Sequence, residues 1–140
     1  MLMAWGWMIN TIKKVANFVY DRLGPGHEEA IYRDAMSVEL QDRGYTVKTE
    51  APVSIRYTTK KGKDMIVGSG KIDLYLRKGD SEGVIELKTV SKILKENGKK
   101  TKEDTKEYHQ LKKYLNALNV DISVLINFPF PPEKRPEIFQ

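Results

Sequence analysis

The sequence predicts a single α/β domain over residues 1–140, with a mixed β-sheet flanked by helices. Apolar residues recur at helical spacing near the N-terminus and then alternate with polar residues at a period of two. A second helical stripe and a near-continuous apolar strand follow near the C-terminus. The resulting order is α-α-β-β-β-β-α-β, and the chain shows no internal repeat and no domain boundary.

The first two predicted helices cover residues 9–22 and 27–44. The first has its apolar residues on one stripe and its basic residues outward. "LGPG" at 23–26 breaks the chain between them. Early glutamates suit the start of the second helix, and Gly44 suits its end. Residues 1–8, "MLMAWGWM", are expected to form an ordered lead-in that packs on the body.

Residues 45–59, 65–78 and 83–90 alternate with the period of strands. Pro52 is expected to interrupt the first of these segments. The glycines of "VGSG" are expected to bend or bulge the second. "KKGKD" at 60–64 is expected to form a hairpin turn between the first two segments.

The C-terminal third contains a polar, Lys-rich loop at 91–104, a helix at 105–119 and an apolar strand at 120–128. An apolar strand without alternation is typical of the buried centre of a sheet. The Pro-rich tail at 129–140 cannot continue a sheet centre, because proline has no N–H to donate.

The composition favours an intracellular, cytoplasmic protein that binds a polyanion. The chain has no cysteine, a net charge of +5 and a pI of about 9.3. Disulfides and thiolate metal sites are therefore excluded. No apolar run is long enough for a transmembrane helix, so no membrane partner is expected. At this chain length the basic charge favours a polyanionic partner only mildly.

The stretch "GVIELKTV" at 83–90 places Glu86 and Lys88 on one face of a strand. Asp73 lies inside the preceding strand, where aspartate is normally depleted. If the two strands pair, Asp73 can lie near Glu86. Two such carboxylates repel each other unless a cation lies between them, and Mg²⁺ prefers oxygen ligands of this kind. The alternative is a solvent-exposed Glu–Lys pair, which "ELK" alone would favour.

The combination of Asp73 with "ELK" resembles the D…(D/E)xK signature of the PD-(D/E)XK nuclease superfamily. "GHEEAIY" resembles the motif of the narrower GxxExxY family, through Gly26, Glu29 and Tyr32. With "QLKKYL" and "LINF", the resemblance covers residues 9–128. It implies a restriction-endonuclease-like fold. Isoleucine precedes Asp73 where the superfamily has proline, which removes no ligand.

The resemblance implies a role for each matched residue. Asp73 and Glu86 would hold Mg²⁺ or Mn²⁺, the backbone carbonyl of Leu87 would add a ligand, and Glu29 would help to bind the metal and its waters. Lys88 would be the catalytic lysine that acts on the attacking water.

Gln110 and Tyr114 match a Q-x-x-x-Y pattern that lies near the site in exonuclease-like branches of the superfamily. Gly26 and Tyr32 would be structural members of the motif. Core packing is an equally open interpretation of Tyr32 and Tyr114. The two histidines, His27 and His109, lie next to motif residues and are interpreted as incidental.

The Lys-rich loop is expected to hold phosphates by electrostatic attraction. A solvated loop without this role is an equally open interpretation. Its candidate nucleic-acid-binding residues are Lys92, Lys95, Lys99, Lys100 and Lys102.

The resulting hypothesis is a metal-dependent nuclease that hydrolyses phosphodiester bonds in DNA. One alternative is a Holliday-junction resolvase, which would act as a homodimer. The other is a catalytically silent nucleic-acid-binding module. Symmetric cutting of a four-way junction by a dimer would favour the resolvase, and DNA binding without cleavage in any divalent metal would favour the binding module.

Overall fold

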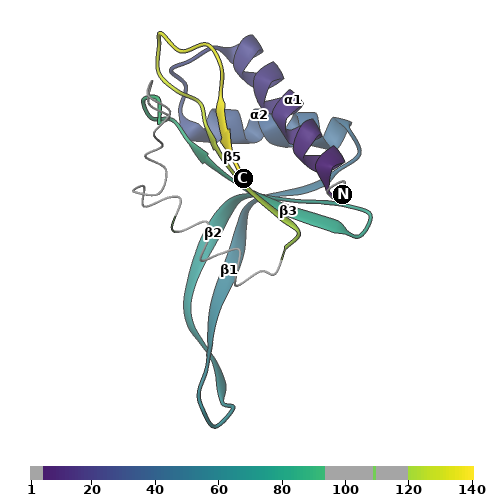
Figure 1. The fold of residues 1–140 in the computed structure, drawn as a ribbon, viewed down its shortest axis with the longest axis vertical. Helices are drawn as coiled ribbons and strands as arrows, with labels where there is room; N and C mark the ends of the chain where they lie inside the picture. The colour runs from purple at the N-terminus through teal and green to yellow at the C-terminus, as the bar shows by residue number, and fades with distance from the viewer. Residues whose placement is uncertain (1–4, 94–108, 110–119) are drawn as a thin grey trace.

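The protein is a mixed five-stranded sheet with two helices on one face (Figure 1). The computed structural model describes residues 5–93, 109 and 120–140. The sheet order is β1-β2-β3-β4-β5, with β3 and β4 parallel and the other neighbours antiparallel. This confirms the predicted α/β class. The elements are α1 (Gly6–Leu23), α2 (Glu29–Asp42), β1 (Thr46–Thr58), β2 (Asp64–Lys78), β3 (Ser81–Lys88), β4 (Ile122–Asn127) and β5 (Glu137–Phe139).

Both predicted N-terminal helices are present, with shifted ends. Helix α1 begins at Gly6, so the last residues of the expected lead-in belong to the helix, and Met8 is fully buried. Helix α2 begins at Glu29, because the chain before it forms a turn in which Gly24 and Gly26 have positive φ angles. Gly44 follows α2 with a φ of 90°, as expected of a residue that ends a helix.

The prediction that Pro52 interrupts the first strand is wrong. β1 is one continuous strand, and Pro52 pairs with Lys71 of β2. β1 lies at the edge of the sheet, where a residue without an N–H can be tolerated because half of the backbone groups have no neighbouring strand.

The predicted bulge in β2 is confirmed, next to Gly68. The register with β1 shifts between Ile55 and Arg56, which leaves Val67 without an opposite residue. An extra residue of this kind increases the local twist of a strand pair.

Of the two C-terminal strands, β4 lies inside the sheet and β5 lies at its edge. β4 is almost entirely buried between β3 and β5, as its apolar run predicted. The tail does not continue the centre, but its residues Glu137–Phe139 add the edge strand β5. The sequence pattern did not predict this strand. The helix predicted at 105–119 falls outside the described residues except for His109.

Two apolar clusters lie on the two faces of the sheet. The first joins α1 and α2 to the sheet and includes Ile85 and Leu87; the second includes Val84. The alternation predicted for β3 is therefore confirmed, with both faces buried. Within the part of the chain that the structure describes, no helix is both long and apolar enough to cross a membrane.

Candidate active site

Asp73 and Glu86 meet where β2 and β3 stop pairing. The ladder between these strands ends at Leu74 and Ile85, one residue short of the two carboxylates. Beyond that point side chains replace the backbone bonds. The N–H of Asp73 donates to Oε1 of Glu86, and the N–H of Leu87 donates to Oδ2 of Asp73, both at 2.8 Å. The expected proximity of the two carboxylates is thus present, and each holds the other strand's backbone.

The environment of this pair disfavours negative charge. Glu86 is 8% exposed. Burial, followed by the charge of Asp73, raises the pKa of Glu86 to about 8, and Glu29 acts in the same direction. Burial also raises the pKa of Asp73, which the N–H of Leu87 partly offsets. The ionised forms of these two neighbouring carboxyl groups are therefore disfavoured. A cation bound between them would stabilise the ionised forms.

The donor set suits Mg²⁺ or Mn²⁺ held by few protein ligands. Mg²⁺ commonly binds through one or two carboxylates and keeps several waters. Asp73 and Glu86 supply two carboxylates, and the backbone of Leu87 borders them. The described residues contain no group of three or more His, Asp or Glu side chains arranged to hold a metal. Asp73 and Glu86 lie together as a pair of carboxylates, and Glu29 is close enough to influence Glu86 electrostatically.

Lys88 follows Glu86 by two residues on the same strand, so its side chain points to the same face. Its charge lowers the pKa values of both Asp73 and Glu86, which places it near the pair. The carbonyl of Lys88 accepts a bond of 2.9 Å from the N–H of Phe128. The lysine is therefore fixed at its backbone, while its half-buried side chain remains accessible.

Tyr32 explains why glycine, glutamate and tyrosine occur at their spacing. Its hydroxyl donates to the carbonyl of Gly24 at 2.6 Å and accepts from the N–H of His27 at 3.3 Å. The ring is fully buried and stacks on Phe128 with centroids 4.3 Å apart. Tyr32 thus packs in the core and ties down the turn that sets Glu29 at the first position of α2. Gly26, with a φ of 95°, allows that turn.

We expect Tyr32→Phe to destabilise the protein by about 1 kcal/mol, because two backbone groups lose their buried partner while the ring stacking remains. Cleavage should fall as well, since the turn before Glu29 loosens. Urea unfolding followed by circular dichroism measures the first effect. Tyr57→Phe is the matched control for the stability measurement alone, because Tyr57 is 61% exposed. Equal stability of Tyr32→Phe and the native protein would contradict this role of the hydroxyl.

Arg33 and Glu50 also border the candidate site, and neither was predicted from the sequence. Nη1 of Arg33 lies 3.6 Å from Oε1 of Glu50, and both charges act on Asp73. The register of β1 with β2 places Glu50 opposite Asp73. Glu50 has a φ of 50°, the only positive φ of a non-glycine residue in the described ranges. The i, i+4 spacing of Glu29 and Arg33 on α2 was a usable signal for the arginine; nothing in the local pattern marked Glu50.

Asn127 fixes the chain as it leaves β3. It is fully buried, its Nδ2 donates to the carbonyl of Val90 at 3.2 Å, and its Oδ1 accepts from the N–H of Val90 at 3.0 Å. Nδ2 also donates to Oε1 of Glu137 at 2.8 Å. These bonds give a physical reason for the asparagine of "LINF". They hold the segment that directly follows Lys88.

The remaining predicted residues are placed only in part. Lys92 lies 3.9 Å from the carboxylate of Glu133, in a half-exposed ion pair. Nε2 of His27 lies 2.9 Å from the carbonyl of Leu23, which fits a local role at the end of α1. His109 is exposed. Other candidates lie outside the described residues: Lys95, Lys99, Lys100, Lys102, Gln110 and Tyr114.

Comparison with known protein families identifies the superfamily of this chain. Residues 7–138 match the family described as the PD-(D/E)XK nuclease superfamily. Among solved structures, the protein titled "Crystal structure of SSO0001" is similar, with a TM-score of 0.45 and 18% identity. The match covers 93% of this chain and 64% of that one. No curated protein matches the sequence. The narrower GxxExxY resemblance stays a prediction, whereas the family match extends over nearly the whole chain: it belongs to the PD-(D/E)XK nuclease superfamily.

Proposed function

We propose that this protein is a metal-dependent nuclease that hydrolyses phosphodiester bonds in DNA. The observation that carries the proposal is the interlocked pair of Asp73 and Glu86, with Lys88 on the same strand face. The raised pKa values of both carboxyl groups mean that a positive charge beside them would stabilise their ionised forms. Mg²⁺ or Mn²⁺ would supply this charge and, when bound, would polarise a phosphoryl oxygen and acidify water.

Each side chain then has a distinct task. Asp73 and Glu86 would hold the metal, with Leu87 offering its carbonyl. Lys88 would orient the attacking water and stabilise the negative charge that develops on the phosphate. Glu29 would orient water at the site from the start of α2.

Arg33 adds a second positive charge beside Asp73. A guanidinium group can bind a phosphate through two parallel hydrogen bonds. Its present partners are carboxylates, Asp34 at 3.0 Å and Glu50 at 3.6 Å. A substrate phosphate could replace the exposed Glu50 as the partner of Arg33 and bind it more strongly. We infer that Arg33 positions the substrate.

The proposal is tested by incubating linear duplex, circular single-stranded and four-way-junction DNA with the protein in Mg²⁺, Mn²⁺ or EDTA. We expect cleavage with either metal and none in EDTA. Matched RNA substrates establish whether DNA is preferred. Paired symmetric nicks in the junction, made by a dimer, would instead indicate a resolvase. DNA binding without cleavage in any divalent metal would overturn the nuclease and leave a binding module.

A further inference from the structure

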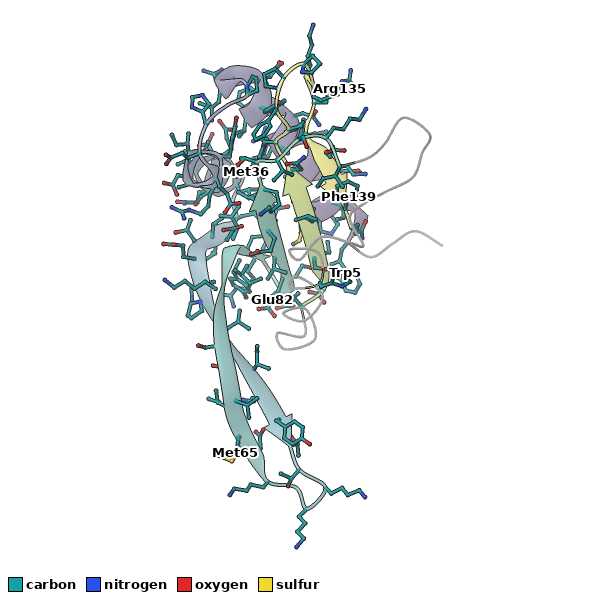
Figure 2. All side chains as sticks on the ribbon, turned by 90° about the vertical axis from the view of Figure 1, so that its left-hand side faces the viewer. Trp5, Met36, Met65, Glu82, Arg135 and Phe139 are labelled. Atoms are coloured by element: carbon teal, nitrogen blue, oxygen red, sulfur yellow. The ribbon has the colours of Figure 1, made fainter. Side chains whose placement is uncertain are left out.

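The far ends of β1 and β2 form a hairpin that projects from the rest of the molecule (Figure 1). We call residues 54–69 the arm. None of its residues is buried. In Figure 2 the labelled Met65 lies near the end of this projection, far from Met36 in the body. The arm is a two-stranded ribbon, and β2 runs from it directly into Asp73.

The arm exposes large apolar side chains to solvent. Tyr57 is 61% exposed, Met65 50%, Ile66 55% and Val67 63%. Single exposed apolar residues are ordinary, but adjacent ones commonly mark a binding surface. An isolated two-stranded hairpin is also marginally stable in water. A partner that covers these side chains would therefore stabilise the arm.

The end of the arm carries a concentrated positive charge. Lys60, Lys61 and Lys63 are exposed, and none of them forms an ion pair with another residue that the structure describes. Arg56 is paired with Asp64 at 2.8 Å. The four basic residues and one acid leave a formal charge of +3 on the arm. Its partner should accordingly be an anion.

The turn that presents these lysines is held by its own hydrogen bonds. The N–H of Lys63 donates to Oγ1 of Thr59 at 3.0 Å, and the N–H of Thr59 donates to the carbonyl of Lys63 at 2.8 Å. Gly62 has a φ of 87°, which suits a tight hairpin turn. The lysines are therefore displayed from a defined turn, and less conformational entropy is lost when they bind.

We propose that the arm binds duplex DNA beside the cleavage site, with its lysines on the phosphates and its apolar side chains against a groove. This inference rests on the proposed function and specifies its substrate as double-stranded. The arm is about 25 Å long at the usual rise per strand residue, less than one helical turn of B-DNA. A two-stranded ribbon fits the major groove. One duplex can therefore contact the arm and reach Asp73.

The positive charge of the arm also favours DNA over a second copy of the chain as its partner. Two arms paired at their ends would bring six exposed lysines together and repel each other. A duplex instead offers phosphates to the lysines and base edges to Tyr57 and Met65, which lie opposite each other and on one face of the arm. In the major groove, apolar side chains can contact the methyl group of thymine.

The test is the salt dependence of binding to a 30-base-pair duplex, measured by fluorescence anisotropy in EDTA so that no cleavage occurs. In the triple variant Lys60→Gln/Lys61→Gln/Lys63→Gln, the slope of log K against log salt should fall by about 2.7, since each lost phosphate contact contributes about 0.9. At about 0.15 M salt this corresponds to roughly 100-fold weaker binding. The double variant Met65→Ser/Ile66→Thr should weaken binding and keep the native slope.

The matched control is Lys13→Gln/Lys14→Gln/Lys134→Gln, which removes the same charge from exposed lysines of α1 and the tail. This control should keep the native slope. Equal slopes for the two triple variants would overturn the proposal, because net charge alone would then explain binding. Loss of a dimer in Met65→Ser/Ile66→Thr, with unchanged DNA affinity, would assign the arm to a second copy.

Thermal unfolding of every variant confirms that it folds. Cleavage by the native protein is scored separately from binding. Cleavage of DNA together with binding that does not depend on the arm would contradict the proposed role of the arm. The proposed nuclease function would still stand. Arm-dependent binding without cleavage in any divalent metal would overturn the nuclease and leave the arm as a DNA-binding element.

Discussion

Lys88→Ala should lower the rate of DNA cleavage at saturating substrate by roughly 10²–10⁴-fold, the range observed when an enzyme loses one group that stabilises charge or moves a proton in the transition state. Lys88 is the side chain on the strand face of Glu86 that carries positive charge, and it acts on both carboxyl groups. Its removal would leave the developing phosphate charge without this counterion.

Single-turnover cleavage measures this effect, with the DNA affinity determined in parallel. The affinity should change much less than the rate, since one lysine among several contributes little to binding. Lys13→Ala removes an equivalent side chain from the exposed face of α1 and serves as the control. Native activity in both Lys88→Ala and Asp73→Ala would rule out the assigned mechanism.

Replacing Glu86 with glutamine should abolish metal-dependent cleavage and yet stabilise the metal-free protein at pH 8. Glutamine has nearly the same shape, and its carbonyl oxygen can still accept the N–H of Asp73. It cannot carry the charge that burial and Asp73 disfavour. We expect a gain of about 1–3 kcal/mol in the free energy of unfolding, because each pKa unit corresponds to about 1.4 kcal/mol.

The pH dependence of this effect has a defined sign. Burial raises the pKa of Glu86 from 4.5 to about 8, so the folded protein binds more protons than the unfolded chain between these values. Its stability in EDTA should therefore fall as pH rises from about 5 to about 8. Urea unfolding at several pH values should show a shallower fall in Glu86→Gln. Adding Mg²⁺ should stabilise the native protein and leave the variant unchanged.

Glu39→Gln is the control for this experiment. It neutralises a glutamate of α2 that forms an exposed ion pair with Arg43 at 3.2 Å, away from the site. Such pairs contribute about 0.3–0.5 kcal/mol, so this variant should be slightly less stable and retain the native pH profile. A Glu86→Gln protein that is destabilised at pH 8 would contradict the unfavourable charge proposed for Glu86.

Local periodicity determined much of this fold and the proximity of Asp73 and Glu86 in its candidate site. A strand alternates its faces at every residue, so the positions of Val84, Ile85 and Glu86 followed from the sequence. Asp73 and Glu86 lie on successive strands joined by a short turn, and such a hairpin has few alternative registers. Their proximity was predictable for that reason. The motif containing Glu29 and Tyr32 further predicted that the start of α2 lies near these two carboxylates.

Only the tertiary structure decided which distant groups border the candidate site. Arg33 and Glu50 approach Asp73 from two different elements, and no periodicity links residues so far apart in sequence. The hydroxyl of Tyr32 serves the turn before its own helix, which became apparent only once its bond to Gly24 was known. Position in the sheet decided the rest. Pro52 is tolerated because β1 is an edge strand, and β1 and β2 form an exposed arm because they extend past the sheet's other strands. Propensity and period act over a few residues, whereas edges, projections and charge clusters arise from where whole elements end relative to one another.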